Sequence, residues 1–236
     1  MTPSEKLILA LDIPDFSAAK KMIDDLGDEV LFYKIGLELL MSDDYFKLIS
    51  YLKNKNKKVF CDLKLYDISE TVGRAVKNLS KHDVDLLTIH TASRGIMEQA
   101  AQNKGKMDVI AVTILTNLDE KDLNEMGFDP KISLQDLAIK KTKLALDSGL
   151  NGVVASGLEA PILRKNFGND FLIVSPGIRL EAVANDDQKR VCDVKTALKN
   201  GSSHLVVGRP ITRDANPREA AKKFNALINE TYLSSF

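Results

Sequence analysis

Short apolar segments recur along the chain at a regular rhythm, separated by longer segments of mixed polarity. Eight of them have the length of β-strands: residues 7–12, 30–36, 58–64, 84–90, 108–115, 152–156, 171–175 and 204–208. Most are almost continuously apolar and do not alternate with polar residues. Parallel strands that are covered on both faces have this pattern. The hydropathy pattern therefore predicts eight buried, parallel strands.

The segments between these strands carry helical periodicity. Residues 15–27, 133–149 and 216–230 place apolar side chains three and four residues apart, which is the spacing of one helix face. Ser133 and Asn216 stand where helix N-caps belong, because their side chains accept hydrogen bonds from the first free backbone N–H groups. These patterns predict amphipathic helices that cover the strands.

Eight strands alternating with eight helical segments predict an α/β fold: a (β/α)₈ TIM barrel that forms a single domain over residues 1–236. A doubly wound open sheet is the alternative, but no GxGxxG motif follows the first strand. The two longest connections span residues 116–132 and 176–192. Structureless connections of this length often act as lids or binding loops.

Composition narrows the class of protein. The 236 residues include 33 Lys+Arg and 33 Asp+Glu, so no charge excess favours nucleic acid or a membrane surface as partner. Two cysteines, Cys61 and Cys192, are too few for a disulfide framework and lack CxxC spacing. No signal peptide is visible, and no apolar run approaches the ~18 residues of a membrane span. A soluble, cytoplasmic protein is expected.

Charged or polar residues recur where the predicted strands end. In a barrel, active groups gather at these ends. The residues are Asp12, Lys34, Asp62, Lys64, His90, Arg179 and Arg209. Side chains two apart on a strand point the same way, so Asp62 and Lys64 should share a face at the barrel mouth.

With Lys34 and Asp67, this pair would form an alternating array of ammonium and carboxylate groups. Opposite charges hold one another ionised. Such an array could fix a lysine as a proton donor, or as a cation that stabilises developing negative charge. Two alternatives stay open: a purely structural ion-pair cluster, and a divalent metal site with carboxylate ligands.

Gly208 ends the last predicted strand and Arg209 follows it, at a position where barrels often bind phosphate. Backbone N–H groups and a guanidinium would together hold the anion. Ordinary turn chemistry also accounts for a glycine and a proline at this point. The motif is therefore a candidate phosphate site.

Taken together, several motifs resemble the orotidine 5′-phosphate decarboxylase family over nearly the whole chain. The most specific is "DLKLYDI" at residues 62–68, which matches the family's D-x-K-x-x-D-I signature. "LALD", "KIG", "VTILT", "SPGIR" followed by Gln188, and "VVGRPIT" occur in the family's order. The ordered set is more specific than any single motif.

The resemblance implies roles for individual residues. Asp12 and Lys34 would bind the ribose hydroxyls, and Asp62 would lie beside the substrate carboxylate. Lys64 would donate a proton to C6 of the pyrimidine, and Asp62, Asp67 and Lys34 would complete the catalytic set. Further ligand contacts are implied for Ile68, Thr71 and Thr116, and phosphate contacts for Arg179, Gln188, Gly208 and Arg209.

The resemblance also implies partners. Asp67 would reach into the neighbouring subunit's site, which makes a homodimer the functional unit. Orotidine 5′-phosphate and UMP would be substrate and product, with no cofactor and no metal.

Two rival functions remain. A metal-dependent sugar-phosphate decarboxylase or aldolase of the same superfamily shares the D-x-K strand. A non-catalytic nucleotide-binding protein is the other, although a pure binder has no need of a costly charge cluster.

Overall fold

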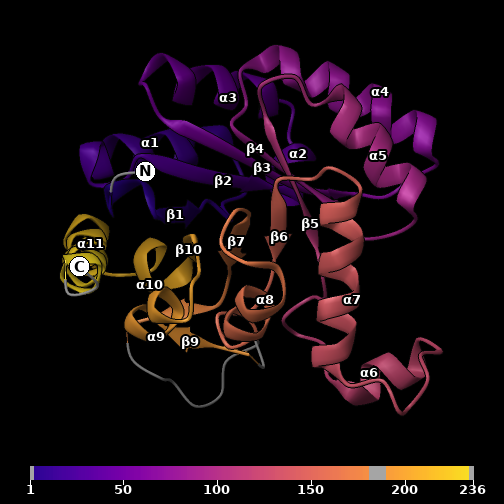
Figure 1. The fold of residues 1–236 in the computed structure, drawn as a ribbon. Coiled ribbons are helices and arrows are strands. Elements are labelled where there is room, and N and C mark those ends of the chain that lie inside the picture. Colours follow the sequence, from indigo (N-terminus) through magenta and orange to yellow (C-terminus); the bar gives the residue numbers. More distant parts are fainter. Residues whose placement is uncertain (1–2, 181–189, 234–236) are drawn as a thin grey trace.

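Eight parallel strands close into a barrel in the computed structural model, which describes residues 3–180 and 190–233 (Figure 1). Their spatial order is β1-β10-β7-β6-β5-β4-β3-β2, and β2 closes the ring against β1. The barrel strands are β1 (Leu7–Ala10), β2 (Phe32–Gly36), β3 (Lys58–Leu65), β4 (Leu86–His90), β5 (Asp108–Val112), β6 (Gly152–Val154), β7 (Leu172–Ser175) and β10 (His204–Val207). A small separate sheet pairs β8 (Ile178–Arg179) with β9 (Cys192–Asp193). The predicted (β/α)₈ barrel is confirmed.

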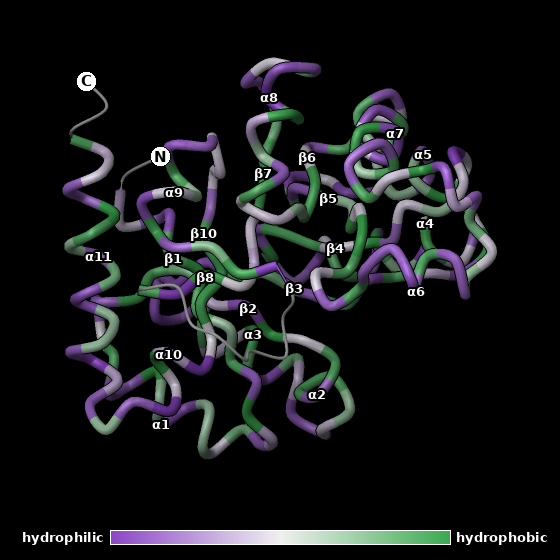
Figure 2. The backbone as a smooth tube through the Cα atoms, turned by 90° about the horizontal axis from the view of Figure 1, so that it is seen from below, coloured by the Kyte–Doolittle hydropathy of each residue, from purple (hydrophilic) through white to green (hydrophobic). Residues whose placement is uncertain are grey.

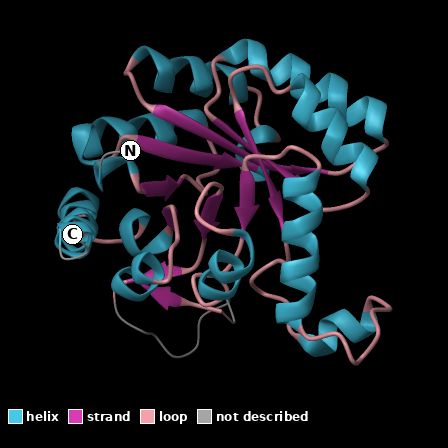
Figure 3. Cartoon of the chain, in the orientation of Figure 1, coloured by secondary structure: helices cyan, strands magenta, loops and turns pink. Residues whose placement is uncertain are grey.

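Helices surround the strands on the outside (Figure 3). They are α1 (Phe16–Leu26), α2 (Leu37–Leu40), α3 (Tyr45–Asn54), α4 (Ser69–Leu79), α5 (Arg94–Asn103), α6 (Glu120–Glu125), α7 (Leu134–Asp147), α8 (Ala160–Phe167), α9 (Val194–Lys199), α10 (Arg209–Thr212) and α11 (Pro217–Leu233), with 3₁₀ turns at Pro3–Glu5, Gly27–Glu29 and Ser80–His82.

The predicted N-caps of α7 and α11 are confirmed. Ser133 accepts a hydrogen bond from the backbone N–H of Asp136, and Asn216 accepts one from that of Glu219. Along α7 and α11, hydrophilic and hydrophobic residues alternate, as expected of helices with one buried face (Figure 2).

The apolar residues of the barrel form two layers, one outside the strands and one inside them. The larger layer lies between the strands and the helices, and includes Cys61. The smaller fills the barrel interior with Ile8, Phe32, Phe60, Leu86, Ile110, Val174 and Val206. The next residues on the same face after Phe32 and Phe60 are Lys34 and Asp62. The interior therefore changes from apolar to charged toward the carboxyl ends of the strands.

The connection at residues 116–132 is not structureless, contrary to the sequence-based expectation. It contains α6, which begins at a capping box formed by Asp119 and Asp122. Leu123 and neighbouring apolar residues pack with Leu137 of α7 in a small satellite core. This segment projects from the barrel beside the start of α7 (Figure 1). Local capping and a few apolar contacts are enough to order it.

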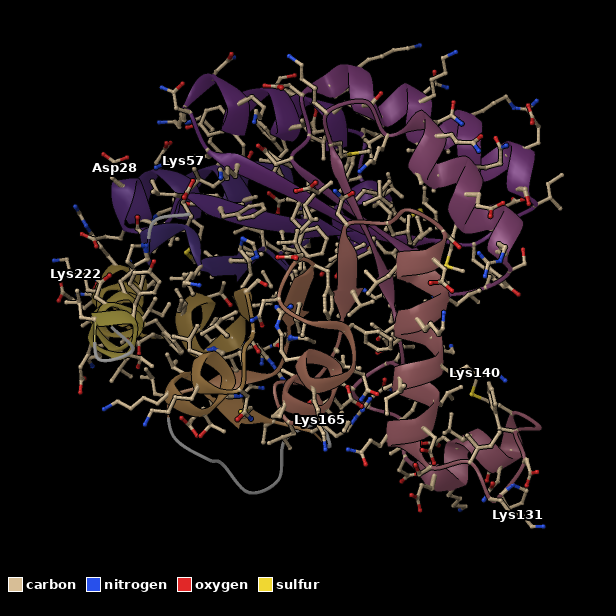
Figure 4. The ribbon with its side chains drawn as sticks, viewed as in Figure 1. Asp28, Lys57, Lys131, Lys140, Lys165 and Lys222 are labelled. Atoms are coloured by element: carbon tan, nitrogen blue, oxygen red, sulfur yellow. The ribbon has the colours of Figure 1, made fainter. Side chains whose placement is uncertain are left out.

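Most lysines lie away from the barrel mouth. Lys131, Lys140, Lys165 and Lys222 are exposed and come from different parts of the chain (Figure 4). Lys57 differs, because it is buried at the amino end of β3 and its ammonium lies 2.9 Å from a carboxylate oxygen of Asp28 (Figure 4). Within the described ranges, no helix combines the length and apolarity needed to cross a membrane.

Candidate active site

A cavity of about 600 Å³ opens at the carboxyl ends of the barrel strands. Its floor is apolar and includes Phe60, Val154, Val174 and Val206. Its wall carries most of the site residues that were expected from the strand ends or implied by the family resemblance: Asp12, Lys34, Asp62, Lys64, Thr116, Arg179, Gly208 and Arg209. This volume is typical of sites for small molecules.

Four charged side chains alternate in sign along one wall of the cavity. The ammonium nitrogen of Lys34 lies 3.0 Å from an oxygen of Asp12 and 3.5 Å from an oxygen of Asp62. The ammonium nitrogen of Lys64 lies 2.8 Å from the other oxygen of Asp62. The structure therefore brings together the array predicted from sequence, except for Asp67.

Burial and neighbouring charges act in opposite directions on this array. Burial alone would lower the pKa of Lys34, but the carboxylates of Asp62 and Asp12 outweigh it and raise that pKa. Burial alone would raise the pKa of Asp62, but Lys34, Lys64 and a hydrogen bond from Thr88 lower it. Both groups are therefore held in their charged forms.

Strand β3 reaches Lys64 through an irregular backbone. Its pairing with β4 shifts register between Cys61 and Leu65. Lys64 has a φ of 47°, in the left-handed region that non-glycine residues seldom adopt. Its backbone N–H donates to the hydroxyl of Thr88 at 3.0 Å. Simple alternation thus predicted the correct face for Lys64 but not the bulge that places it there.

The candidate phosphate residues lie on the same cavity. Arg179 is largely buried, and its guanidinium donates to the carbonyl oxygen of Ile178 at 3.0 Å. A Cβ atom at Gly208 would lie 3.3 Å from that of Ala10, so a side chain there would press against β1. Arg209 begins α10. Gln188 lies outside the described residues.

Among the described residues, three that the family resemblance implied for the site do not line the cavity of their own chain. Asp67 is exposed, and its carboxylate accepts a hydrogen bond from the backbone N–H of Ile68 at 2.6 Å. The side chain of Ile68 is 69% exposed. Thr71 lies half-buried in the first turn of α4. All three come from the segment that follows β3.

Other polar residues at the mouth were not predicted. Glu38 and Arg213 line the cavity. Arg213 follows Arg209 by four residues, a spacing that can bring two side chains together on a helical turn. Thr88 was missed because it lies inside an apolar strand, where a threonine gives no functional signal.

A buried ion pair also escaped prediction. The guanidinium of Arg190 pairs with the carboxylate of Glu159, and it donates to the carbonyl oxygens of Ile114 at 3.3 Å and Leu115 at 2.9 Å. Those carbonyls directly precede Thr116. The S-x-x-E spacing of Ser156 and Glu159 is the one signal in the sequence that marks the acid.

Comparison with known proteins assigns the barrel to a family. The family model described as "Orotidine 5′-phosphate decarboxylase / HUMPS family" matches residues 5–224. The chain belongs to this family. A relative from Methylococcus capsulatus, named orotidine 5′-phosphate decarboxylase, is 50% identical, and the match covers 98% of this chain and 95% of the relative. One of the same name from Caulobacter sp. is 45% identical, with 94% and 96% covered.

Solved structures agree with this assignment to the orotidine 5′-phosphate decarboxylase / HUMPS family. The crystal structure of orotidine 5′-phosphate decarboxylase from Lactobacillus acidophilus has a TM-score of 0.83 at 31% identity, covering 95% of this chain and 99% of that one. The structure from Pyrococcus horikoshii has a TM-score of 0.75 at 23% identity, covering 94% and 99%, and supports the fold alone. The family resemblance inferred from sequence is confirmed, and the chain is an enzyme.

Proposed function

We propose that this chain decarboxylates orotidine 5′-phosphate to uridine 5′-phosphate and CO₂, the last step of UMP synthesis, without a cofactor. One observation carries the proposal. The ammonium of Lys64 lies 2.8 Å from Asp62 on the wall of a cavity that also presents Arg179 and Arg209. An oriented cation together with two guanidiniums suits a phosphorylated substrate that develops negative charge. In this proposal, residues 1–236 form a single barrel domain, and the enzyme works in the cytoplasm.

The chemistry explains why a fixed ammonium is needed. When the bond between C6 and the carboxyl group breaks, its electron pair stays on C6 and CO₂ leaves. No carbonyl is placed to delocalise that pair, so the protein must stabilise it electrostatically. Lys64 then donates its proton to C6 and is reprotonated from solvent. Asp62 keeps the ammonium oriented beside the reacting carbon.

The remaining cavity residues bind the parts of the substrate that do not react. We assign the ribose hydroxyls to Asp12 and Lys34, and the pyrimidine to Thr116. We assign the phosphate to Arg179, Gln188, Gly208 and Arg209. Binding energy from the phosphate can be used to order the charged array, so it should appear in turnover as well as in affinity.

A homodimer completes this proposal. Asp67, Ile68 and Thr71 would enter the site of the neighbouring subunit, which is in keeping with their lying outside the cavity of their own chain. Large side chains in this segment are exposed, with Tyr66 at 71% and Ile68 at 69%. Exposed apolar side chains that lie together commonly mark protein interfaces.

The activity is tested by following orotidine 5′-phosphate spectrophotometrically, with and without EDTA. We expect turnover by the wild type that EDTA leaves unchanged. Lys64→Ala should lose at least about a thousandfold in kcat and still bind UMP. Loss of activity to EDTA would favour the metal-dependent sugar-phosphate enzymes that were the rival function. Substantial turnover by Lys64→Ala would remove this residue from the mechanism.

The shared site is tested by mixing two inactive variants, Lys64→Ala and Asp67→Ala. Mixed dimers would contain one site with both native residues, so activity should recover to a fraction of the wild type. Subunit exchange is confirmed separately with differently tagged chains. Exchange without recovery would show that Asp67 does not act across an interface.

A further inference from the structure

Thr88 on β4 contacts both members of the Lys64–Asp62 ion pair without reaching the cavity. Its side chain is fully buried, with 0% exposure. Its hydroxyl donates to the Asp62 oxygen at 2.8 Å, and the same oxygen faces the Lys64 ammonium. The hydroxyl also accepts the backbone N–H of Lys64 at 3.0 Å. One hydroxyl thus holds the carboxylate of one residue and the backbone of the other.

Other buried threonines at the same end of the barrel behave differently. Thr91 donates to the carbonyl oxygen of Val112 at 2.7 Å, and Thr113 donates to that of Val154 at 2.9 Å. Both hydroxyls form their hydrogen bonds with the backbone of the neighbouring strand, as buried hydroxyls commonly do. The partners of Thr88 are instead the two charged residues of the site.

The backbone at Lys64 needs this support. The strand pairing is interrupted between Cys61 and Leu65, so the ladder with β4 does not fix Lys64 directly. A left-handed φ on a non-glycine residue costs about 1–2 kcal/mol and persists only where neighbouring contacts enforce it. The hydrogen bond from the Lys64 N–H to Thr88 is such a contact.

We propose that Thr88 is a positioning residue for this enzyme: its hydroxyl sets the turn of the backbone at Lys64 and the orientation of the Asp62 carboxylate. The effect on turnover rests on the proposed decarboxylase function, whereas the effect on geometry does not. Thr88 does not line the cavity and acts only through its hydrogen bonds to Lys64 and Asp62.

Loss of the hydroxyl should also alter the titration of Asp62. The charged groups that act on this carboxylate are Lys34 from β2 and Lys64 from β3, with Asp12 reached through Lys34. Three other titratable groups feel the charge of Asp62: Tyr45 of α3, Cys61 of β3 and His90 of β4. Burial raises the pKa of Asp62, and the two lysines followed by the Thr88 hydrogen bond lower it. Without that bond, ionisation of Asp62 should require a higher pH.

The test compares Thr88→Val, which keeps the shape, with Thr88→Ser, which keeps the hydroxyl. For Thr88→Val we expect kcat to fall roughly ten- to a hundredfold, because a hydrogen bond to a charged group is lost, with KM changed less than about threefold. The acid limb of the pH profile should move to higher pH. Thr88→Ser should stay within about threefold of wild type, as should the control Thr91→Val.

A structural readout separates this proposal from the proposed reaction. In crystals of unliganded Thr88→Val, Lys64 should leave the left-handed region, or its ammonium should move away from Asp62. If the wild type proves inactive on orotidine 5′-phosphate, this comparison still decides the geometric role. Unchanged Lys64 geometry, or wild-type kcat with an unshifted pH profile, would overturn the proposal. Should Thr88→Val fail to fold, Thr88→Ala replaces it in both measurements.

Discussion

Lys34 shows how one side chain is kept charged in a nearly closed place. Only 12% of it is exposed, whereas its partner Asp12 is 62% exposed. The more buried carboxylate of Asp62 is the larger of the two charge contributions that raise the pKa of Lys34. The charge of Lys34 therefore depends more on Asp62 of the neighbouring strand β3 than on Asp12 of the open loop after β1. Lys34 in turn keeps Asp62 ionised.

Arg209 allows the phosphate assignment to be tested with a single residue. Arg209→Ala should lower kcat/KM for orotidine 5′-phosphate by about ten- to a hundredfold, because a charge-assisted hydrogen bond is lost. Steady-state kinetics measures this directly. The variant should turn over orotidine, which lacks the phosphate, at the wild-type rate.

Orotidine thus serves as the matched control for Arg209→Ala. An equal loss on both substrates would mean that Arg209 supports the fold of the mouth and not the phosphate. The exposed Arg218 of α11, which lies outside the cavity, is the control side chain: Arg218→Ala should leave both rates unchanged.

Among the elements, the loops after β5 and β6 are both joined to the segment before β9 through Arg190, which pairs with the buried Glu159. Both side chains are nearly enclosed, at 10% and 13% exposure. Removing one partner of a buried ion pair leaves an uncompensated charge. This lowers the free energy of unfolding much more than removing both partners. Arg190 also holds two carbonyls of the segment that leads to Thr116.

A double-mutant cycle should reveal this coupling. Glu159→Gln and Arg190→Gln should each lower the free energy of unfolding by about 3 kcal/mol. The double variant should lose at least about 1 kcal/mol less than the sum of the single losses. Denaturant unfolding measures all four proteins. Additive losses would indicate two independent side chains.

The elements themselves were largely predictable from sequence. Continuous apolar runs located all eight barrel strands, because both faces of each are covered. Ser133 and Asn216 marked their helices through capping, which is a local interaction. The placement of Asp12, Lys34, Asp62 and Lys64 around one cavity follows from the rule that barrel strands all end at one rim.

What could not be predicted depends on contacts between distant segments. Thr88 matters only because β3 bulges beside it, and no pattern within either strand shows that register shift. Glu159 and Arg190 are far apart in the chain and meet only in the folded mouth. The ordered segment containing α6 was missed because its satellite core needs Leu137 from the following helix.

For the whole molecule, the amino ends of the barrel strands contain a buried titratable group that is far from the proposed active site. The site lies at the carboxyl ends, whereas His204 begins β10 at the opposite end and is 5% exposed. Its ring packs edge-on against Phe32, with centroids 5.6 Å apart. Burial, followed by repulsion from Lys6 and Lys58, lowers the pKa of His204 to about 4. The folded protein therefore keeps this histidine neutral.

This histidine should make stability depend on pH. Between its folded pKa of about 4 and an unfolded value near 6.5, the unfolded chain binds more protons, so acidification favours unfolding. From pH 7.5 to pH 5, His204 should account for a loss of about 2 kcal/mol. Urea unfolding at pH 7.5 and at pH 5 measures the loss of stability in the wild type and in His204→Leu. The contribution of His204 should be absent from the variant.

The exposed His82 provides the comparison. His82→Leu should retain the loss that comes from His204, because this variant still contains the buried histidine. If His204→Leu lost as much stability on acidification as the wild type does, other groups would have to explain the effect.

The left-handed backbone at Lys64 has a consequence for how the protein can change over time. Glycine adopts that conformation freely, whereas alanine does not, so Lys64→Gly should be about 1 kcal/mol more stable than Lys64→Ala, although neither has an amine. Calorimetry on the two inactive proteins would show the difference. Laboratory evolution that selects for heat tolerance alone should accordingly favour glycine over alanine at position 64. Only a growth requirement for pyrimidines would keep the lysine in such a population.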